Sequence, residues 1–156
     1  MKYILLIVMF CSKILVAQEL KVVADTFSAD EVVGISIFTG NVKIKRDHDE
    51  LNATKVTIYT DKKNKPTKFV AVGDVSFKIQ TVALTEYEGI AQKAIYLPLK
   101  KEYKFYKDVH LKQINEKKEI FGDEVILNTI DGKASAKGFK KAPVIMIYDI
   151  KDEKKR

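Results

Sequence analysis

The sequence predicts an all-β protein made of one antiparallel sheet of repeated hairpins. The first observation is an internal repeat: Gly40-Asn41-Val42 returns as Gly73-Asp74-Val75 and again, without its glycine, as Lys107-Asp108-Val109. The second is an alternation of apolar and polar residues, the pattern of half-buried strands. The third is that helical patterns are missing after the first 17 residues. Self-similarity at a period of about 33 residues, made only of strands and turns, is typical of stacked hairpins.

A second repeat predicts that this sheet is folded over. Each copy has an apolar residue or Gly, then Ala or Gly two positions later, then Val or Ala three positions after that. Beyond the small residue the apolar positions move to the other face of the strand, as a bulge or a corner makes them do. Four such switches at equivalent places predict a sharp crease lined by small residues. The copies are Phe27, Ala29 and Val32; Leu51, Ala53 and Val56; Gly89, Ala91 and Ala94; and Ile120, Gly122 and Val125.

Strands joined by turns are expected throughout the rest of the chain. The longest, residues 69–79, keeps one apolar face over about 35 Å. Residues 46–50 are expected to form a charged turn, and Asp131-Gly132 is a signal for a two-residue hairpin. The expected strands are residues 20–24, 36–45, 51–60, 69–79, 87–96, 103–113, 119–128, 133–138 and 143–150.

Residues 1–17 predict a secretory signal peptide. Lys2 supplies a positive head, residues 3–10 an apolar core and Leu15-Val16-Ala17 a small-residue end, so cleavage is expected after Ala17. A retained membrane anchor is the alternative. It is disfavoured because a span needs about 20 apolar residues, whereas Ser12-Lys13 interrupts this run.

The chain after the signal is expected to be one domain, residues 18–150, with a charged, disordered tail at residues 151–156. The only cysteine, Cys11, lies in the signal, and the bulky Phe10 before it disfavours lipidation. A mature chain without cysteine suits an oxidising compartment, and a Gram-negative periplasm is the expected location. With Lys2 and Lys13 removed, 26 basic residues stand against 21 acidic ones, for a net charge of +5.

No catalytic or metal-binding constellation stands out. His48 and His110 are far apart in the sequence and are expected to be solvated, not metal ligands. Carboxylates such as Asp47 and Asp49 fall near turns or on outward faces, where charge usually serves solubility. No catalytic motif, phosphate loop or zinc spacing is present. The sequence therefore predicts no enzyme activity, no metal and no cofactor.

The sequence gives less support to two other functional classes. The basic surplus could serve nucleic-acid binding, but no recognised motif is present and an exported protein does not meet nucleic acid, so no such partner is expected. A secreted glycan-binding or glycan-modifying β-protein is also conceivable. A glycan-modifying enzyme would need paired carboxylates projecting into a cleft.

Five short motifs follow one another through the domain. They are Phe38-Thr39-Gly40-Asn41-Val42, Leu51-x-Ala53-x-Lys55-Val56, Lys65-Pro66-x-x-Phe69, Ala91-x-x-Ala94-x-Tyr96, and Gly122-Asp123-x-Val125 leading to Gly132. This ordered set resembles the OstA-like family over nearly all of residues 18–150. The resemblance implies a β-taco, or open β-jelly roll, in which a folded-over antiparallel sheet holds lipid acyl chains in an apolar interior.

The same resemblance implies a function and partners. It implies a non-catalytic periplasmic protein that carries lipopolysaccharide, held by its lipid A portion, between the inner and outer membranes. It also implies head-to-tail self-association and contacts with inner-membrane and outer-membrane components of similar fold. A membrane-anchored transport component of the same fold is the alternative within the family.

An apolar groove is the first site expected. At about 0.8 kcal/mol per CH₂, a twelve-carbon chain resists entering water by about 8 to 10 kcal/mol, so a carrier must offer an equivalent apolar lining. From alternation alone the same residues would simply fill a core, and the family resemblance favours the groove. The expected lining is Leu20, Val22, Phe38, Val42, Ile44, Val56, Ile58, Phe69, Val75, Phe77, Tyr96, Phe105, Val109, Leu111, Val125 and Leu127.

The last strand is the second site expected. Val144, Ile145, Met146, Ile147 and Tyr148 are apolar on both faces and carry no charge. Because an open sheet leaves unpaired N–H and C=O groups at its edges, this strand is expected to pair with the first strand of another molecule. The alternative is that both of its faces are buried within the domain.

Overall fold

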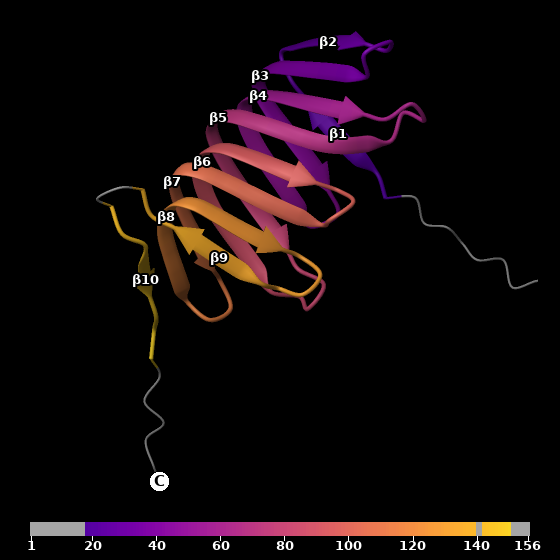
Figure 1. Ribbon diagram of the computed structural model, residues 1–156. Helices are drawn as coiled ribbons and strands as arrows, with labels where there is room; N and C mark the ends of the chain where they lie inside the picture. Colours follow the sequence, from indigo (N-terminus) through magenta and orange to yellow (C-terminus); the bar gives the residue numbers. More distant parts are fainter. Residues whose placement is uncertain (1–17, 140–141, 151–156) are drawn as a thin grey trace, which may run out of the picture.

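The computed structural model describes residues 18–139 and 142–150, and these form one antiparallel sheet (Figure 1). Strands β3 to β8 lie side by side in sequence order, with β1 and β2 beside β3 at one edge and β9 and β10 beside β8 at the other. The predicted all-β fold is confirmed. The strands are β1 Leu20–Val23, β2 Thr26–Asp30, β3 Ile35–Arg46, β4 Asp49–Thr60, β5 Pro66–Gln80, β6 Glu86–Leu97, β7 Glu102–Gln113, β8 Lys118–Asn128, β9 Ala134–Lys137 and β10 Ile145–Ile147.

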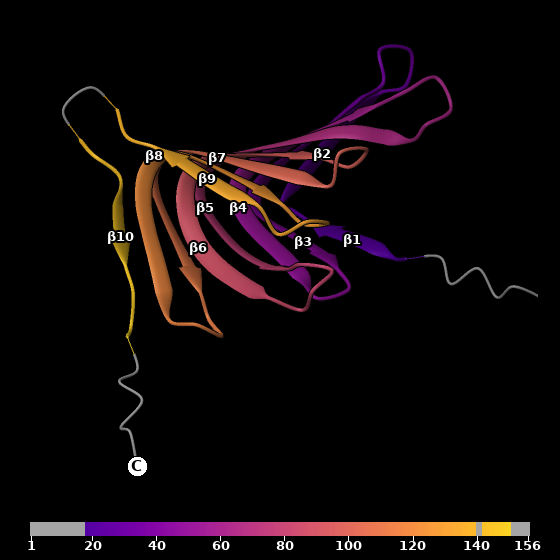
Figure 2. The same cartoon turned by 60° about the horizontal axis from the view of Figure 1, so that its bottom comes forward.

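The long strands are all bent at the same level, so the sheet folds over into two leaves (Figure 2). The register shifts there between Thr39 and Val42 in β3, between Val72 and Val75 in β5, and between Tyr106 and Val109 in β7. We call this line the crease. The first leaf contains β1, residues 42–46, 49–53, 75–80, 86–91, 109–113 and 118–122, and β10. The second leaf contains β2, residues 35–39, 55–60, 66–72, 93–97, 102–106 and 124–128, and β9.

The first sequence repeat produces the crease. Both residues of each pair, Gly40-Asn41, Gly73-Asp74 and Lys107-Asp108, have positive φ angles, which lie between 45° and 86°. Two successive left-handed residues add a residue to one strand of the ladder and turn its direction. Glycine is favoured at the first position because a side chain there would strike the neighbouring strand: a Cβ at Gly73 would lie 2.7 Å from Thr54 Oγ1.

One copy of the second repeat is wrong. The copy predicted at Phe27, Ala29 and Val32 does not switch faces, because β2 ends at Asp30 and the chain turns back through residues 31–34. The side chain of Val32 is 98% exposed at this turn.

The crease passes instead between β1 and β2. There the backbone N–H of Asp25 donates to the carbonyl of Gly40 at 2.9 Å. Val22, Ala24 and Phe27 have the spacing of Leu51, Ala53 and Val56, five residues earlier than the predicted copy. The short motif fits both the predicted copy and this earlier one, and only the pairing of β1 and β2 with β3 shows which of them crosses the crease.

Two expectations near the C-terminal end are also wrong. Asp131-Gly132 is not a two-residue hairpin, because β8 ends at Asn128 and β9 begins only at Ala134. The side chain of Asn128 accepts the backbone N–H of Ile130 at 2.9 Å, which stabilises a longer loop. The strand expected at residues 143–150 is reduced to β10. The predicted signal peptide and tail lie outside the described residues.

The inner faces of the two leaves meet in one apolar core. Next to the crease, Val in one strand lies opposite a small residue in the next: Val42 opposite Ala53, Val75 opposite Ala91, and Val109 opposite Gly122. Small residues on alternate strands let the leaves approach closely where they join, without overpacking. The predicted lining of the crease by small residues is therefore confirmed at three of its four places.

Replacing Lys107 by Gly should stabilise the protein. Lys107 has a φ of 62°, and the left-handed conformation costs a residue with a Cβ about 1–2 kcal/mol. Glycine avoids that cost, and its greater freedom in the unfolded chain offsets about 0.4–1 kcal/mol of the gain. We expect the free energy of unfolding, measured by urea denaturation, to rise by up to about 1 kcal/mol.

Lys112→Gly in the same strand is the matched control. Lys112 lies in a regular stretch of β7, so glycine there should lower the free energy of unfolding by about 0.5–1 kcal/mol. Equal losses from both variants would show that the conformation of Lys107 carries no strain.

Candidate functional site

The predicted lining residues do come together on the inner faces of the two leaves. Those that are not fully buried come from β1, β3 and β5, whereas all those of β6, β7 and β8 are buried. Leu20 in β1 is 38% exposed, and Val22, Phe38, Ile44 and Phe69 are partly buried against the core. The remaining predicted residues are buried: Val42, Val56, Ile58, Val75, Phe77, Tyr96, Phe105, Val109, Leu111, Val125 and Leu127.

Eight further core residues were not among those predicted to line the groove. They share the inward strand positions of the predicted set, so alternation alone could have found them. The small ones have too little apolar surface to stand out in a sequence, and the tyrosines carry a hydroxyl group. They are Ala53, Ala71, Ile79, Tyr87, Ala91, Ala94, Tyr103 and Ile120.

The interior is filled by its own side chains. Phe77 of the first leaf stacks on Phe105 of the second, with ring centroids 3.9 Å apart, and Tyr96 stacks on Tyr103 at 4.3 Å. An apolar cavity of about 50 Å³ remains, and Leu20, Ile44, Leu51 and Phe69 are among the residues that line it. A cavity that binds benzene is roughly 150 Å³. An acyl chain can therefore enter only if the leaves separate.

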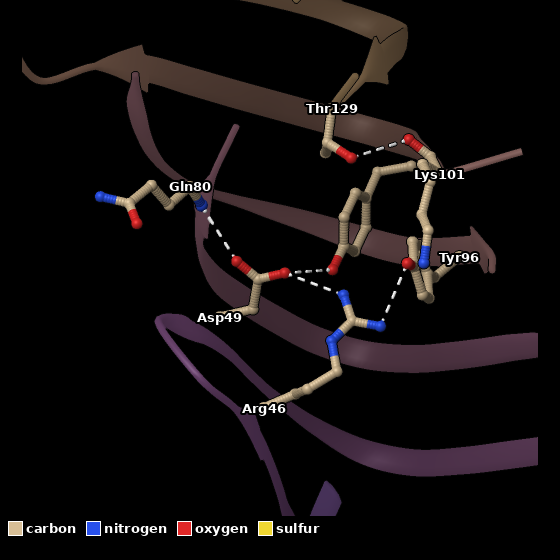
Figure 3. A network of polar contacts seen from close by, with 7 residues as sticks. Arg46, Asp49, Gln80, Tyr96, Lys101 and Thr129 are labelled. Atoms are coloured by element: carbon tan, nitrogen blue, oxygen red, sulfur yellow. Dashed lines mark hydrogen bonds and ion pairs between the residues drawn. The ribbon is translucent and has the colours of Figure 1, made fainter. Parts of the chain in front are cut away.

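A polar network joins the two leaves at the mouth, the side of the fold opposite the crease (Figure 3). Arg46 ends β3 and Asp49 begins β4 in the first leaf, whereas Tyr96 and Tyr103 lie in the second. Arg46 donates from Nη1 to Tyr96 Oη at 3.1 Å and from Nη2 to Asp49 Oδ2 at 3.1 Å. The Tyr103 hydroxyl donates to the same carboxylate oxygen at 3.0 Å.

The expected charged turn at residues 46–50 is therefore wrong in part. Only Asp47 and His48 form the turn. The side chains of Arg46 and Asp49 are 25% and 18% exposed and point inward, because Arg46 has the strand parity of Ile44. That parity could have indicated the inward orientation from the sequence. The residues were expected in solvent because a charged side chain beside a turn is usually solvated.

Further along the mouth a second contact ties the leaves together. The backbone N–H of Val82, in the turn after β5, donates to the carbonyl of Thr129 at the end of β8 at 2.9 Å. Thr129 is itself held by its hydroxyl, which donates to the carbonyl of Lys101 at 3.0 Å. The mouth is thus closed at its centre by side chains and toward β8 by backbone.

Burial raises the pKa of the Tyr103 phenol well above its ordinary value, and the nearby charge of Asp49 acts in the same direction. The phenol therefore remains protonated at neutral pH and serves as a donor to Asp49. An ionised phenolate here would face a carboxylate across the mouth and break the contact.

The residues expected at the partner edge lie at an edge of the sheet. Ile145, Met146, Ile147 and Tyr148 are between 43% and 54% exposed, and β10 pairs only with β8 among the described strands. Val144 packs against the core. The alternative that both faces of this strand are buried within the domain is therefore wrong.

The histidines offer no metal site in the described part of the chain. His110 is half-buried, not fully solvated: its ring stacks on Phe121, and its Nε2 lies 3.2 Å from Glu119 Oε2. Residues 18–139 and 142–150 contain no group of three or more His, Cys, Asp or Glu side chains placed to hold a metal ion. Within these ranges no helix has the length and apolar character needed to cross a membrane.

An open antiparallel sheet, creased into two leaves around an apolar interior, defines a β-taco protein. The chain belongs to the family of LptA/(LptD N-terminal domain) LPS transport proteins, whose model matches residues 21–133. The resemblance to the OstA-like family, and within it to LptA, is confirmed at this level. No curated protein sequence matches the chain.

A solved structure shares the fold. The chain is similar to the crystal structure of LptH, the LptA homologous periplasmic component of the conserved lipopolysaccharide transport device from Pseudomonas aeruginosa. The TM-score is 0.76 at 15% sequence identity, over 85% of this chain and 96% of that one. The similarity confirms the predicted folded-over antiparallel sheet.

Stability at alkaline pH should report the buried phenol of Tyr103. Because the pKa is raised in the folded state, the stabilisation is fully present below the ordinary tyrosine pKa of about 10 and is lost as pH rises above it. We expect the free energy of unfolding to fall by up to about 1.4 kcal/mol per pH unit above pH 10 from this group. Urea denaturation between pH 7 and 11 measures it.

Tyr103→Phe should remove this part of the alkaline loss, at some cost in stability at pH 7. Tyr148→Phe is the control, since the Tyr148 side chain is 54% exposed and its substitution should leave the alkaline profile as in the wild type. An identical slope in wild type and Tyr103→Phe would contradict the assignment.

Proposed function

We propose that the protein is a non-catalytic periplasmic carrier that holds lipopolysaccharide by the acyl chains of its lipid A portion between its two leaves. In this proposal it stacks head-to-tail as a bridge between inner-membrane and outer-membrane components of similar fold. The observation that carries the proposal is the apolar inner surface, which runs across every long strand of a sheet that is open at both edges. Membership of the LPS transport family supports it.

The shape of the inner surface supports acyl-chain binding. A row of inward residues runs from Phe38 through Val56, Ala71 and Ala94 to Phe105, each opposite the next across the ladder. Such a row lies perpendicular to the strands and parallel to the crease. An acyl chain laid along it would be shielded over the width of the sheet, and a second copy at either edge would lengthen the shielded path.

The edges support head-to-tail stacking. β1 is antiparallel to β3, β10 is antiparallel to β8, and five antiparallel steps separate β3 from β8, so β1 and β10 run in opposite directions. A second copy in the same orientation would therefore present its β1 antiparallel to β10, so that β-augmentation would continue the antiparallel sheet. Because the two surfaces differ, the contact does not close on itself and builds open-ended chains.

The outward face of the first leaf supports the same arrangement. A cross-strand ladder of alternating charge runs through Lys45, Glu50, Lys78, Glu88, Lys112 and Glu119. It begins with Lys21 beside Lys45 at the β1 edge and ends with Glu119 beside β10. Head-to-tail stacking brings the basic beginning of one ladder toward the acidic end of the next.

Phe69→Asp should strongly weaken lipid binding in a protein that still folds. Phe69 lines the cavity and is only partly buried, so a carboxylate there can reach water in the lipid-free protein but not against acyl chains. We expect a loss of about 3 kcal/mol, roughly 100-fold in affinity for lipid A, measured by fluorescence titration.

Val72→Asp is the matched control on the same strand. Val72 is 45% exposed and shares the outward strand parity of Val70, so its variant should bind as the wild type does. Phe77→Asp is a harsher probe, because Phe77 is 3% exposed and stacks on Phe105; it should destabilise the fold as well. Unchanged lipid binding by folded Phe69→Asp would place the lipid elsewhere.

Assembly should depend on β10. Ile145 and Ile147 lie opposite Phe121 and Glu119 on the outward face and are about half exposed. Lysine at both positions should block an edge-to-edge contact, as lysines do on natural edge strands. We expect monomers that still bind lipid, as judged by light scattering across a concentration series in which the wild type grows.

Ile90→Lys controls for the added charge, since Ile90 is 55% exposed in the middle of the sheet and its variant should assemble normally. A wild-type mature chain that stays monomeric at high concentration would contradict the proposed stacking.

A further inference from the structure

The polar network at the mouth stands between two spaces of opposite character. On its inner side, Arg46, Asp49, Tyr96 and Tyr103 close the apolar cavity of about 50 Å³. On its outer side, Arg46, Asp49 and Tyr96 line a polar hollow of about 260 Å³ together with Lys101. We call these four side chains, Arg46, Asp49, Tyr96 and Tyr103, the clasp. The clasp lies where the acyl chains of a bound lipid would end and its polar head would begin.

Stability alone does not explain why four polar side chains lie at the mouth. A partly buried ion pair is often no more stabilising than an apolar pair of the same size, and apolar residues would extend the core without a break. The cation instead makes contacts that can be exchanged. Arg46 has one carboxylate partner, Asp49, and lies 4.8 Å from the centre of the Tyr96 ring.

Asp49 has hydrogen-bond donors other than Arg46. Besides the guanidinium, it accepts the hydroxyl of Tyr103 at 3.0 Å and the backbone N–H of Gln80 at 3.0 Å. When Arg46 moves away, Asp49 still accepts both of these hydrogen bonds. Once the leaves part, it keeps the N–H of Gln80, which belongs to its own leaf, and meets water at the open mouth, so the cost of an unpaired buried charge is avoided. The exchange therefore requires only a new anionic partner for Arg46.

The outer hollow can receive such a partner. Figure 3 shows the side chain of Lys101 extending toward Tyr96 and Arg46 from the opposite rim. His48 also lines the hollow, and the carboxylates there are those of Asp47 and Asp49. A guanidinium binds a phosphate with two parallel hydrogen bonds, and an ammonium adds a point charge.

We propose that Arg46 binds a phosphate on the head of the carried lipid. In the empty protein the hydrogen bonds of the clasp occupy Arg46 and hold the groove closed. A phosphate entering the hollow takes Arg46 from Asp49 and Tyr96, with Lys101 as a second cation. The clasp contact that still joins the leaves, the hydrogen bond from Tyr103 to Asp49, then breaks, and the leaves separate at the clasp and admit the acyl chains. This inference rests on the proposed function and adds the group that is recognised and the contact that opens.

The test compares two lipids with identical acyl chains: lipid A with its phosphates, and the same lipid with the phosphates removed. The wild-type mature chain should bind the phosphorylated lipid about tenfold more tightly. In Arg46→Met this ratio should fall to about one, while the dephosphorylated lipid still binds. Lys45→Met is the matched control, because Lys45 is the preceding residue, points outward and pairs with Glu50 at 3.0 Å; its variant should keep the wild-type ratio.

A second measurement follows the opening itself. Residues 18–156 contain no cysteine, so His48→Cys with Leu99→Cys places one spin label on each rim. Leu99 lies in the same turn as Lys101 and is 87% exposed, so that both proposed cations are kept. The distance between the labels should lengthen when the phosphorylated lipid is added, and much less so in the Arg46→Met background. Tyr96→Phe with Tyr103→Phe keeps both rings but removes both hydroxyls, and should speed association of either lipid about fivefold.

The outcomes distinguish failure of the clasp from failure of the proposed function. An unchanged ratio in Arg46→Met, or a label distance that is the same with and without lipid, overturns the clasp while the proposed function stands. Slower association in the double phenylalanine variant, with the fold intact by circular dichroism, also overturns it. If the wild type binds neither lipid, the proposed function is contradicted, and the clasp with it.

Discussion

The structure depends on pairs of left-handed residues placed at one level of the sheet. A strand of regular geometry cannot turn back over its neighbours, and one bulged strand alone would only kink locally. Here Gly40-Asn41, Gly73-Asp74 and Lys107-Asp108 lie on alternate strands, so every ladder between long strands is interrupted at the same place. The bend brings Phe77 onto Phe105. Without it the inner face of a ten-stranded sheet would be open to water.

A folded-over sheet of this kind has two competing ways to cover its apolar surface. Its leaves can pack on each other, or they can pack on acyl chains. The residual cavity of about 50 Å³ shows that the first solution is adopted here, because apolar surfaces left in water close on one another. Carrying lipid then requires that the closed state be weakly held at the mouth. Exchangeable polar contacts between Arg46, Asp49, Tyr96 and Tyr103 meet that requirement better than a continuous apolar seam.

Much of this architecture could be predicted from the sequence, since strand parity and turn chemistry are local. The crease, its small residues at Ala53, Ala91 and Gly122, and the sixteen lining positions all follow from a period of two. The wrong copy of the repeat, at Ala29, fits the same short motif as the real one at Ala24. Asp49 was expected in solvent because its inward parity was outweighed by the turn beside it. In both cases a local pattern had two readings, and only strand pairing distinguished them.

The sequence by itself determined that the sheet is all-β, which apolar residues of the long strands face inward and where those strands bend, because each of these follows from spacing along one strand. Only the tertiary structure decided how far apart the leaves lie and which side chains meet across them. Arg46 reaches Tyr96 over 50 residues, and Tyr103 reaches Asp49 over 54. Such contacts depend on how side chains from both leaves fill the space between them. That packing is a property of the whole sheet, and no single strand contains it.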